Sequence, residues 1–344
     1  MNAPKSLRRR LIAVLAALTL ALLAASIVPN SASAATKGWK WAEGFHVKHL
    51  KPLDNGLACP KIKLCIAIGD NRVLWSTNPT KKSSWHSVAL EPSSSPDVSG
   101  TIGFDGLSCP TANFCAAVDD IGNVFTTSNP TGGKAAWHGA EIDGIELLQV
   151  GCSGPHLCAA LDYYGNALTS TAPLSGVWHS AHLTNHIGAS FYGVNCAGAS
   201  LCVGVEASGT IYRTTNPGAA TPTWHNSHAA GSWNSVACPT AHKCVAFGGH
   251  KGKGAIAVSS NPGAGSWKAV TLKKDNFGFN VGTCQGTGFC FALSDYWSAN
   301  PKASRAVWHS TNVGTAYSQV EIACPTTKFC LIGDVRGDLI VGHR

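Results

Sequence analysis

The chain has 344 residues, of which 44% are hydrophobic and only 13% are charged. Together with 11 Trp and 11 Phe, this composition excludes a disordered chain, which needs high charge and few aromatic residues. The length allows either two domains of about 150 residues or one larger closed β architecture.

Residues 1–34 have the pattern of a secretory signal peptide. Lys5 and Arg8 to Arg10 precede an apolar run at 11–25 that is short for a membrane span, and Ala-Ser-Ala at 32–34 offers a cleavage site. The alternative is an uncleaved N-terminal anchor. Cleavage removes four basic residues and no acidic one, so the formal net charge falls from +8 to +4, which is too weak to indicate a nucleic-acid or other polyanionic partner. We therefore expect a secreted mature chain without a membrane segment.

All 14 cysteines fall into C-x5-C pairs, whose first members follow one another at intervals of 50, 43, 44, 42, 46 and 40 residues. A period of about 40–50 residues is typical of four-stranded propeller blades. The seven pairs are Cys59-Cys65, Cys109-Cys115, Cys152-Cys158, Cys196-Cys202, Cys238-Cys244, Cys284-Cys290 and Cys324-Cys330. They predict seven repeats.

The repeats share one order of elements. A β-prone stretch ends at the first Cys, the second Cys opens an apolar run such as 115–118, and a polar Asp/Gly/Asn turn follows. Another strand then ends in Ser/Thr-x-Asn-Pro, and a Trp comes last. Short strands bounded by Gly, Pro and Asn favour β structure throughout. We predict an all-β fold, a single seven-bladed β-propeller of four-stranded blades over residues 35–344.

The Cys pairs suit disulfides, because facing residues of a tight antiparallel hairpin lie about 4.5 Å apart at Cα. An exported chain also meets an oxidising compartment. The alternative is zinc, but C-x5-C is not a zinc-finger spacing. We expect one disulfide in each blade and no metal.

The Asn-Pro…Trp segment follows six Cys pairs but not the seventh. A Trp-containing strand stands instead ahead of the first pair, at Trp39-Lys40-Trp41. The simplest inference is that this N-terminal strand completes the last blade, closing the ring and removing an exposed sheet edge.

The Ser/Thr-x-Asn-Pro…Trp segments resemble degenerate Asp-boxes, whose pattern is Ser-x-Asp-x-Gly-x-x-Trp and which occur in sialidase-like and photosystem II assembly-factor-like propellers. The unit from Cys109-Pro110 to Val118 is similar to repeats of secreted bacterial propellers grouped with them, and the resemblance covers almost all of 37–344. It departs from the pattern in having Asn, or once Ala172, for Asp, and an added Pro. The resemblance implies that the boxes are structural turns on the face opposite the active site.

We expect Asn and Pro of each box to form the turn and Trp to fill the gap between neighbouring blades. A His follows the Trp in five repeats: His86, His138, His179, His225 and His309. Because these recur once per blade around a ring, solvent-facing outer-strand positions are favoured over a metal site.

If the strands of a blade, a to d, run outward from the axis, then the b–c turns and the d–a connections between blades share one face, where propellers commonly bind ligands. The b–c turns carry an acidic residue in six of seven blades: Asp70, Asp119 and Asp120, Asp162, Glu206, Asp295, and Asp334. They are either hairpin turn residues or include a carboxylate pair for acid/base chemistry, which requires two about 5–10 Å apart.

The same face collects aromatic residues and histidines: Phe104, Tyr163, Tyr164, His186, Phe191, Tyr192, His228, Trp233, Phe277, Phe279, Tyr296, Trp297 and Tyr317. Aromatic rings beside carboxylates suit sugar rings. The alternative is that many of these rings fill the blade tops as core.

We therefore expect a secreted, monomeric, non-catalytic binding or scaffold propeller, whose partner is an extracellular glycan or an envelope protein. No cofactor is expected, and calcium is left open. The alternative is a carbohydrate-active enzyme, a polysaccharide lyase before a glycosidase. A lyase needs a Tyr or His to move the proton and a cation to neutralise the uronate. The candidate catalytic residues are His186, Tyr192, Lys251, Tyr317, Asp162 and Glu206. A sialidase, which needs an arginine triad, is disfavoured because only five Arg follow residue 34.

Overall fold

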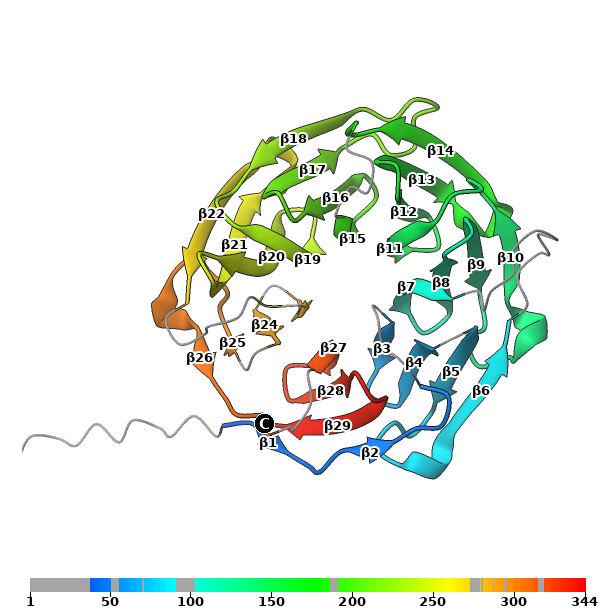
Figure 1. Ribbon diagram of the computed structural model, residues 1–344, viewed down its shortest axis with the longest axis vertical. Helices are drawn as coiled ribbons and strands as arrows, with labels where there is room; N and C mark the ends of the chain where they lie inside the picture. The colour runs from blue at the N-terminus through cyan, green and yellow to red at the C-terminus, as the bar shows by residue number, and fades with distance from the viewer. Residues whose placement is uncertain are drawn as a thin grey trace, which may run out of the picture. The chain divides into compact units, whose positions relative to one another are not determined.

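The computed structural model describes residues 38–50, 56–69, 71–90, 103–185, 191–272, 279, 281–286, 288–293, 296–314 and 319–344. Within these ranges the chain forms seven antiparallel sheets that are the blades of a ring (Figure 1). Six sheets have four strands, and in the seventh the outer position is shared by two short strands. The predicted seven-bladed β-propeller is confirmed.

The first four blades follow one another along the chain. Blade 1 comprises β3 (Leu57–Lys61), β4 (Leu64–Gly69), β5 (Arg72–Ser76) and β6 (Trp85–Ala89). Blade 2 comprises β7 (Phe104–Thr111), β8 (Phe114–Asp119), β9 (Asn123–Thr127) and β10 (His138–Glu141). Blade 3 comprises β11 (Leu147–Gly154), β12 (Leu157–Asp162), β13 (Asn166–Ala172) and β14 (Val177–His182). Blade 4 comprises β15 (Phe191–Ala197), β16 (Leu201–Glu206), β17 (Thr210–Thr214) and β18 (Trp224–His228).

The last three blades complete the ring. Blade 5 comprises β19 (Ser232–Thr240), β20 (Lys243–His250), β21 (Lys253–Asn261) and β22 (Ser266–Thr271). Blade 6 comprises β23 (Gly282–Gln285), β24 (Phe289–Ala292), β25 (Tyr296–Ser298) and β26 (His309–Ser310). Blade 7 comprises β27 (Gln319–Thr326), β28 (Phe329–Asp334) and β29 (Asp338–His343), with β1 (Lys40–Trp41) and β2 (Phe45–His46) on its outer edge. Single-turn 3-10 helices precede five outer strands: η1 (Lys82–Ser84), η2 (Lys134–Ala136), η3 (Pro173–Ser175), η4 (Pro262–Ala264) and η5 (Arg305–Val307).

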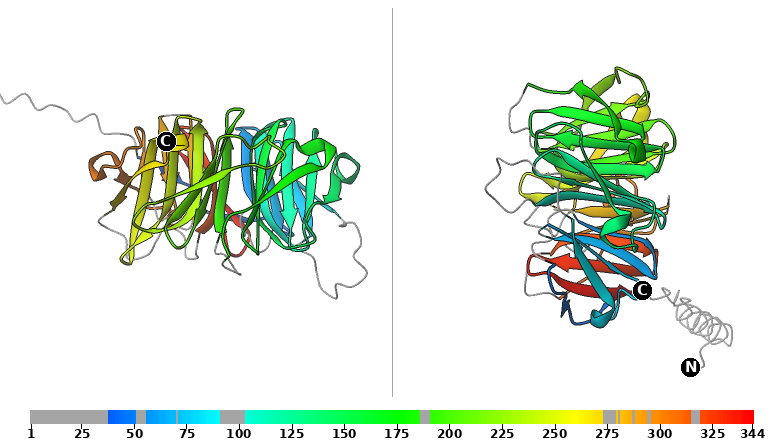
Figure 2. Two further views of the ribbon diagram at one scale, coloured as in Figure 1. Left: turned by 90° about the horizontal axis from the view of Figure 1, so that it is seen from above. Right: turned by 90° about the vertical axis from the view of Figure 1, so that its right-hand side faces the viewer.

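The innermost strands of neighbouring blades contact one another around the axis, and β27 of the last blade contacts β3 of the first. Seen from the side, the strands run between two faces of the propeller (Figure 2). Because successive strands of a blade are antiparallel, the Cys hairpins between its first two strands and the Asn-Pro turns before its outer strand share one face. The b–c turns and the d–a connections share the other.

The hydrophobic core lies between the blades, because each side of a sheet can bury apolar residues only against its neighbour. Seven buried clusters fill the seven interfaces, and a Trp of one blade packs against the preceding blade in each. Six are the box tryptophans Trp85, Trp137, Trp178, Trp224, Trp267 and Trp308. The seventh is Trp39, which is 7% exposed and lies 5.6 Å from Phe291 in an edge-on ring contact. The expected gap-filling role of Trp is confirmed.

The turn of each box is formed by its Ser or Thr as well as by Asn and Pro. The hydroxyl accepts a hydrogen bond from the backbone N–H two residues later, as in Ser76 to Asn78 (3.1 Å) and Thr127 to Asn129 (2.9 Å). The same bond occurs in the other four boxes at Ser170, Thr214, Ser259 and Ser298. All six hydroxyl residues and all six prolines are buried, so the boxes are packed structural turns.

All seven predicted disulfides are present, with Cα atoms 4.0–4.2 Å apart. The two cysteines are direct cross-strand partners in blades 3, 4 and 6, as in Cys152 and Cys158. The second cysteine of every pair is fully buried at the start of its strand. The bond therefore lies between the innermost two strands of each blade.

The N-terminal strand closes the ring as predicted. In β1, Lys40 is opposite His343 and Trp41 is opposite Gly342 of β29. A side chain at Gly342 would place its Cβ 2.2 Å from the Trp41 ring, so only glycine lets this indole lie over the strand. The second edge strand, β2, was not predicted; it pairs with the other end of β29, with His46 opposite Asp338.

The His residues that follow the box tryptophans lie on the outer strands, where four are exposed and His179 is half-buried. Within the described residues, no group of three or more His, Cys, Asp or Glu side chains is placed to hold a metal ion. The described ranges also contain no helix that is long and apolar enough to cross a membrane.

Candidate binding face

Two buried carboxylates of the b–c turns are held by backbone and side-chain hydrogen bonds of their own turns. The N–H of the residue four positions later donates to Oδ1 at 2.8 Å in the Asp119 turn and at 2.7 Å in the Asp162 turn. The side-chain amide of that same residue, Asn123 or Asn166, donates to Oδ2 at 2.8 and 2.6 Å. In the second turn Gly165 has φ +89°, which favours glycine. These carboxylates act as turn residues.

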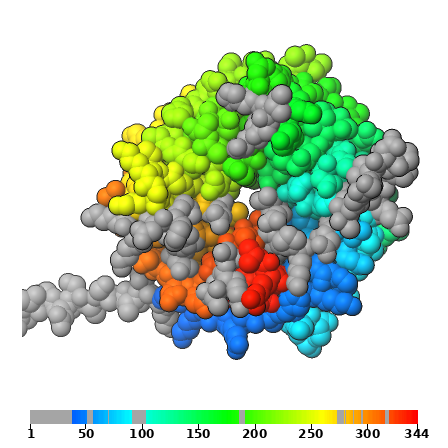
Figure 3. All heavy atoms as spheres, in the orientation of Figure 1, coloured from blue at the N-terminus to red at the C-terminus, as the bar shows by residue number. Residues whose placement is uncertain are grey.

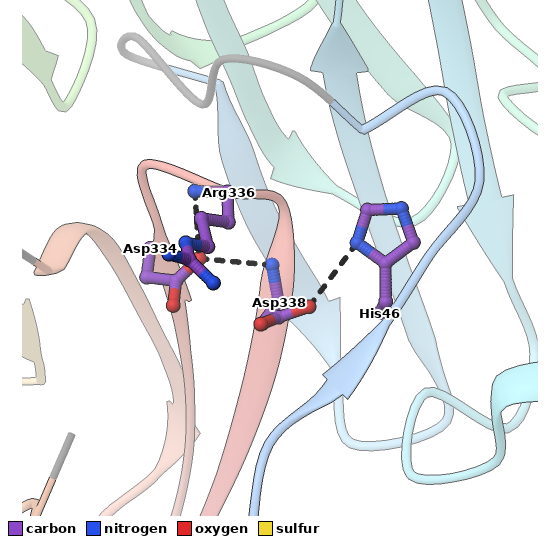
Figure 4. Close-up of polar contacts among 4 residues, drawn as sticks. All are labelled: His46, Asp334, Arg336 and Asp338. Carbon is purple, nitrogen blue, oxygen red and sulfur yellow. Dashed lines mark hydrogen bonds and ion pairs between the residues drawn. The ribbon is translucent and has the colours of Figure 1, made fainter. Parts of the chain in front are cut away.

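The b–c turn of the last blade uses its carboxylate in the same way and also fixes the closing strand (Figure 4). Asp334 Oδ1 accepts hydrogen bonds from the N–H groups of Arg336 (2.9 Å) and Asp338 (3.0 Å). Asp338 Oδ1 in turn lies 3.1 Å from Nδ1 of His46 on β2. These polar contacts therefore connect the turn to β29 and, through Asp338, to β2 of the N-terminal segment.

Glu206 lies in the equivalent position of blade 4 and is 5% exposed. Its Oε2 accepts a hydrogen bond from the Tyr212 hydroxyl at 3.2 Å. Burial, followed by the charge of Glu206, raises the pKa of Tyr212 to about 12. Asp120, next to Asp119, accepts from the Gly103 N–H at 3.2 Å. Asp70 and Asp295 lie outside the described residues.

Three predicted ligand-facing rings belong to the core. Trp233 has no exposed surface and donates its indole N–H to Ala229 O at 3.1 Å, while Tyr296 and Trp297 are 7% and 4% exposed. Trp297 is covered by the guanidinium of Arg344, 3.8 Å above its ring. Trp233 lies at the start of the innermost strand β19, and Tyr296 and Trp297 begin the third strand β25. All three side chains pack into the interfaces between blades, so they cannot stack on a ligand. Phe191 and Phe279 are buried in the same manner.

Three other predicted rings are exposed on the face of the b–c turns. Tyr163 and Tyr164 form the tip of the blade 3 turn and are 40% and 47% exposed, with ring centroids 5.8 Å apart. Tyr192, 48% exposed, lies in the first strand of the next blade, beside its start. His228, at the end of β18, is also exposed. We call Tyr163, Tyr164 and Tyr192 the tyrosine face.

A carboxylate missed in the sequence lies beside this face. Asp143, in the connection between blades 2 and 3, contacts the Asp162 carboxyl group, and burial together with this neighbour raises the pKa of Asp143 to about 7. Burial and the charge of Asp120 also raise the pKa of Glu146 in the same connection. The local sequence Asp-Gly at 143–144 is an ordinary turn signal, so only the fold brings Asp143 to Asp162.

Of the candidate catalytic residues that the structure describes, Asp162 lies in blade 3, Tyr192 and Glu206 lie on adjacent strands of blade 4, and Lys251 lies in blade 5. Asp162 meets Asp143, and Glu206 meets Tyr212, in neighbouring blades. Lys251 is exposed at the tip of the long β20–β21 hairpin of blade 5. His186 and Tyr317 lie outside the described residues, so their relation to Tyr192 and Lys251 stays a prediction.

The arginines lie on several blades. Arg213 donates through Nε to Gly263 O at 2.9 Å, which ties blade 4 to the blade 5 turn, and Arg305 donates to Thr271 O. Arg344 covers Trp297 in blade 6. These three arginines hold neighbouring segments of the propeller together, and no two of them share a site.

A hollow is visible at the centre of the ring (Figure 3). Towards the face of the Cys hairpins, the axis holds a cavity of about 500 Å³ lined by the innermost strands of all seven blades. The first cysteine of each pair lines this cavity, together with Ser108, Asn195, Thr283 and Gln285. The cavity thus lies at the opposite end of the axis from the tyrosine face.

No family model matches the sequence, and no curated protein matches it either. The fold is similar to solved propellers at low identity. "YCF48 bound to D1 peptide" is 13% identical with a TM-score of 0.63, covering 88% of this chain and 95% of that one. "YCF48 from Cyanidioschyzon merolae" is 11% identical (TM-score 0.62; 89% and 98%), and a chain of "Crystal Structure of Mitotic Checkpoint Complex" is 10% identical (0.66; 88% and 93%). These similarities show the propeller fold.

Proposed function

We propose that this protein is a secreted, non-catalytic binding propeller that recognises an extracellular glycan through the tyrosine face. The observation that carries the proposal is the exposure of Tyr163, Tyr164 and Tyr192 on the face of the b–c turns, while most neighbouring rings are core. Exposed rings next to turns with carboxylates suit the C–H faces and hydroxyls of sugars.

Two further observations support a binding role outside the cytoplasm. Every cysteine is disulfide-bonded, which fits an oxidising compartment and the predicted signal peptide at 1–34. The turn carboxylates of Asp119, Asp162 and Asp334 are engaged by their own backbone, which leaves them poorly placed as general acids or bases. A propeller of similar fold is recorded with a bound peptide, so a protein partner in the cell envelope is the natural second ligand class.

The test compares binding of a panel of neutral and uronate glycans, measured calorimetrically, to the mature protein and two variants. Tyr163→Ala/Tyr164→Ala and Tyr192→Ala should each weaken binding about tenfold or more, as expected when an aromatic contact worth about 1.4 kcal/mol is lost. Ile62→Ala is the matched control, because Ile62 is 49% exposed in a Cys hairpin on the other face. Equal affinity in all four proteins would contradict the proposal.

The raised pKa of Asp143, which contacts Asp162, favours one alternative, a carbohydrate-active enzyme, because a carboxyl group that keeps its proton near neutral pH can act as a general acid. The same glycan panel distinguishes it. If the protein released unsaturated or reducing ends from a glycan, and Asp143→Asn abolished this release, the protein would be an enzyme and not a binding protein.

A further inference from the structure

A groove of about 680 Å³ lies on the perimeter where the ring closes. One wall is the turn Val47–His49 that follows β2 of the closing segment, and the other wall is η1 with the start of β6 in blade 1. Figure 1 shows β2 and β6 next to each other at this edge. We call it the seam groove.

The side chains of the seam groove are strongly biased in charge. Its lining includes Lys48, Lys81 and Lys82, which are all exposed, and the two histidines His49 and His86. Among the residues that the structure describes, no acidic side chain lines it. Although the net charge of the chain is modest, the three lysines give the seam groove at least three positive charges.

The floor of the groove is apolar and fixed. Leu74 is 1% exposed, and Trp85 is half-buried with its indole N–H donating to Pro79 O at 3.3 Å. His86 is stacked on Trp75, with ring centroids 5.6 Å apart. An aromatic floor below cationic side chains fits a ring that carries a carboxylate.

The wall contributed by the closing segment is rigid before any ligand binds. The Val47 N–H donates to Gly337 O at 3.2 Å, and the Leu50 N–H donates to Val47 O at 3.3 Å. Leu50 is fully buried, and a Cβ on Gly337 would lie 1.5 Å from its carbonyl oxygen, so the turn packs tightly on the last blade. His49 keeps φ at +69°, a conformation that such packing must hold in place for a residue other than glycine.

We propose that the seam groove binds a uronate-type anionic glycan, with a sugar ring over Trp85 and carboxylates near Lys48, Lys81 and Lys82. This is a second site, separate from the tyrosine face and independent of the function proposed for it. Because the ligand would contact both the closing segment and blade 1, its binding would also stabilise the ring closure.

The experiment measures binding of oligogalacturonate to the full mature protein by calorimetry at low salt, together with the shift in melting temperature. We expect binding that weakens as ionic strength rises, a higher melting temperature with ligand, and at least a fivefold loss of affinity in Lys81→Gln/Lys82→Gln. The matched control is Lys61→Gln/Lys63→Gln, which removes the same charge from exposed positions of blade 1 outside the groove. Tyr163→Ala/Tyr164→Ala should bind oligogalacturonate as the wild type does.

Three outcomes would overturn the proposal. A neutral galactan of equal length could bind as tightly, which would remove the role of the carboxylates. The control variant could lose as much affinity as Lys81→Gln/Lys82→Gln, which would indicate non-specific attraction. An acidic peptide could bind more tightly than oligogalacturonate, which would assign the groove to a protein partner.

Discussion

Asp143 shows how the pKa of a carboxyl group depends on its surroundings in the folded ring. Both carboxylate oxygens of Asp162 accept hydrogen bonds within its own turn, whereas the buried Oδ2 of Asp143 has no hydrogen-bond partner among the described residues and lies near the like-charged Asp162. Ionisation of Asp143 is therefore costly in the folded protein, and its pKa is raised from 3.8 to about 7.

This raised pKa predicts a pH dependence of stability. The folded state holds the Asp143 proton more tightly than the unfolded state, so the stabilising contribution is complete below about pH 4 and is lost as pH rises through 7. Asp143→Asn keeps a donor toward Asp162 but cannot ionise. When the pH is raised from 5 to 8, the melting temperature measured by thermal unfolding should fall more in the wild type than in the variant. An equal loss in both proteins would mean that Asp143 ionises normally.

At the same scale, the sequence predicted the turn chemistry better than the exposure of side chains. Asp followed by Gly and Asn indicated hairpin turns, and the bonds of Asp119 and Asp162 are those of such turns. Trp233, Tyr163 and Tyr192 are all aromatic and all lie near the same face, yet the first is fully buried and the others are exposed. The difference depends on strand register and on bulges, as between Trp233 and Ser235, which no short motif encodes.

The closing element is small for its role. β1 and β2 have two residues each, so their backbone hydrogen bonds with β29 are few, and buried side chains, among them Trp39, Val47 and Leu50, must help to hold the segment. Trp39 is buried among Phe289, Phe291 and the last blade, as the seventh tryptophan of a set in which every blade supplies one.

Trp39→Ala should therefore lower the free energy of unfolding by about 3–5 kcal/mol, the usual cost of removing a buried Trp. Trp41→Ala, in the same strand, should cost less because Trp41 is only half-buried and lies over Gly342. Guanidinium unfolding followed by fluorescence and circular dichroism measures both. A Trp41 variant as unstable as the Trp39 variant would show that the strand pairing, and not the buried ring, holds the seam.

The arrangement of strands and hairpins was predicted from the sequence more fully than any other feature. Repetition supplied six or seven copies of each signal, so the strand order, the Cys hairpins and the missing seventh Trp could be inferred by comparison within one chain. β2 was missed because Phe45–His46 belongs to no repeat, and the seam groove was missed with it.

The whole molecule is held by interfaces between blades and by one covalent bond inside each blade. Polar contacts near the axis add to the apolar clusters, as where Ser108 accepts from Cys152 N–H at 3.0 Å and Asn195 accepts from Cys238 N–H at 3.1 Å. Since each disulfide closes only a hairpin, it stiffens its blade without linking blades to one another.

Removing one disulfide should be tolerated by the fold. Cys196→Ser/Cys202→Ser opens a seven-residue loop, and the lost loop constraint alone should lower the free energy of unfolding by about 2.4 kcal/mol. Peptide mapping without reduction should still find the other six bonds, each within its own blade. A link between cysteines of different blades in the wild type would contradict this architecture.

The pairing of Lys40 with His343 joins positions 303 residues apart (343 − 40). A chain that is threaded through a translocation channel from its N-terminus cannot finish this circle until its final strand has emerged. The first six blades can fold before β1 has a partner, and β1 pairs only once the last blade has formed. This topology is thus compatible with export of an unfolded chain, followed by pairing of β1 with β29 after export.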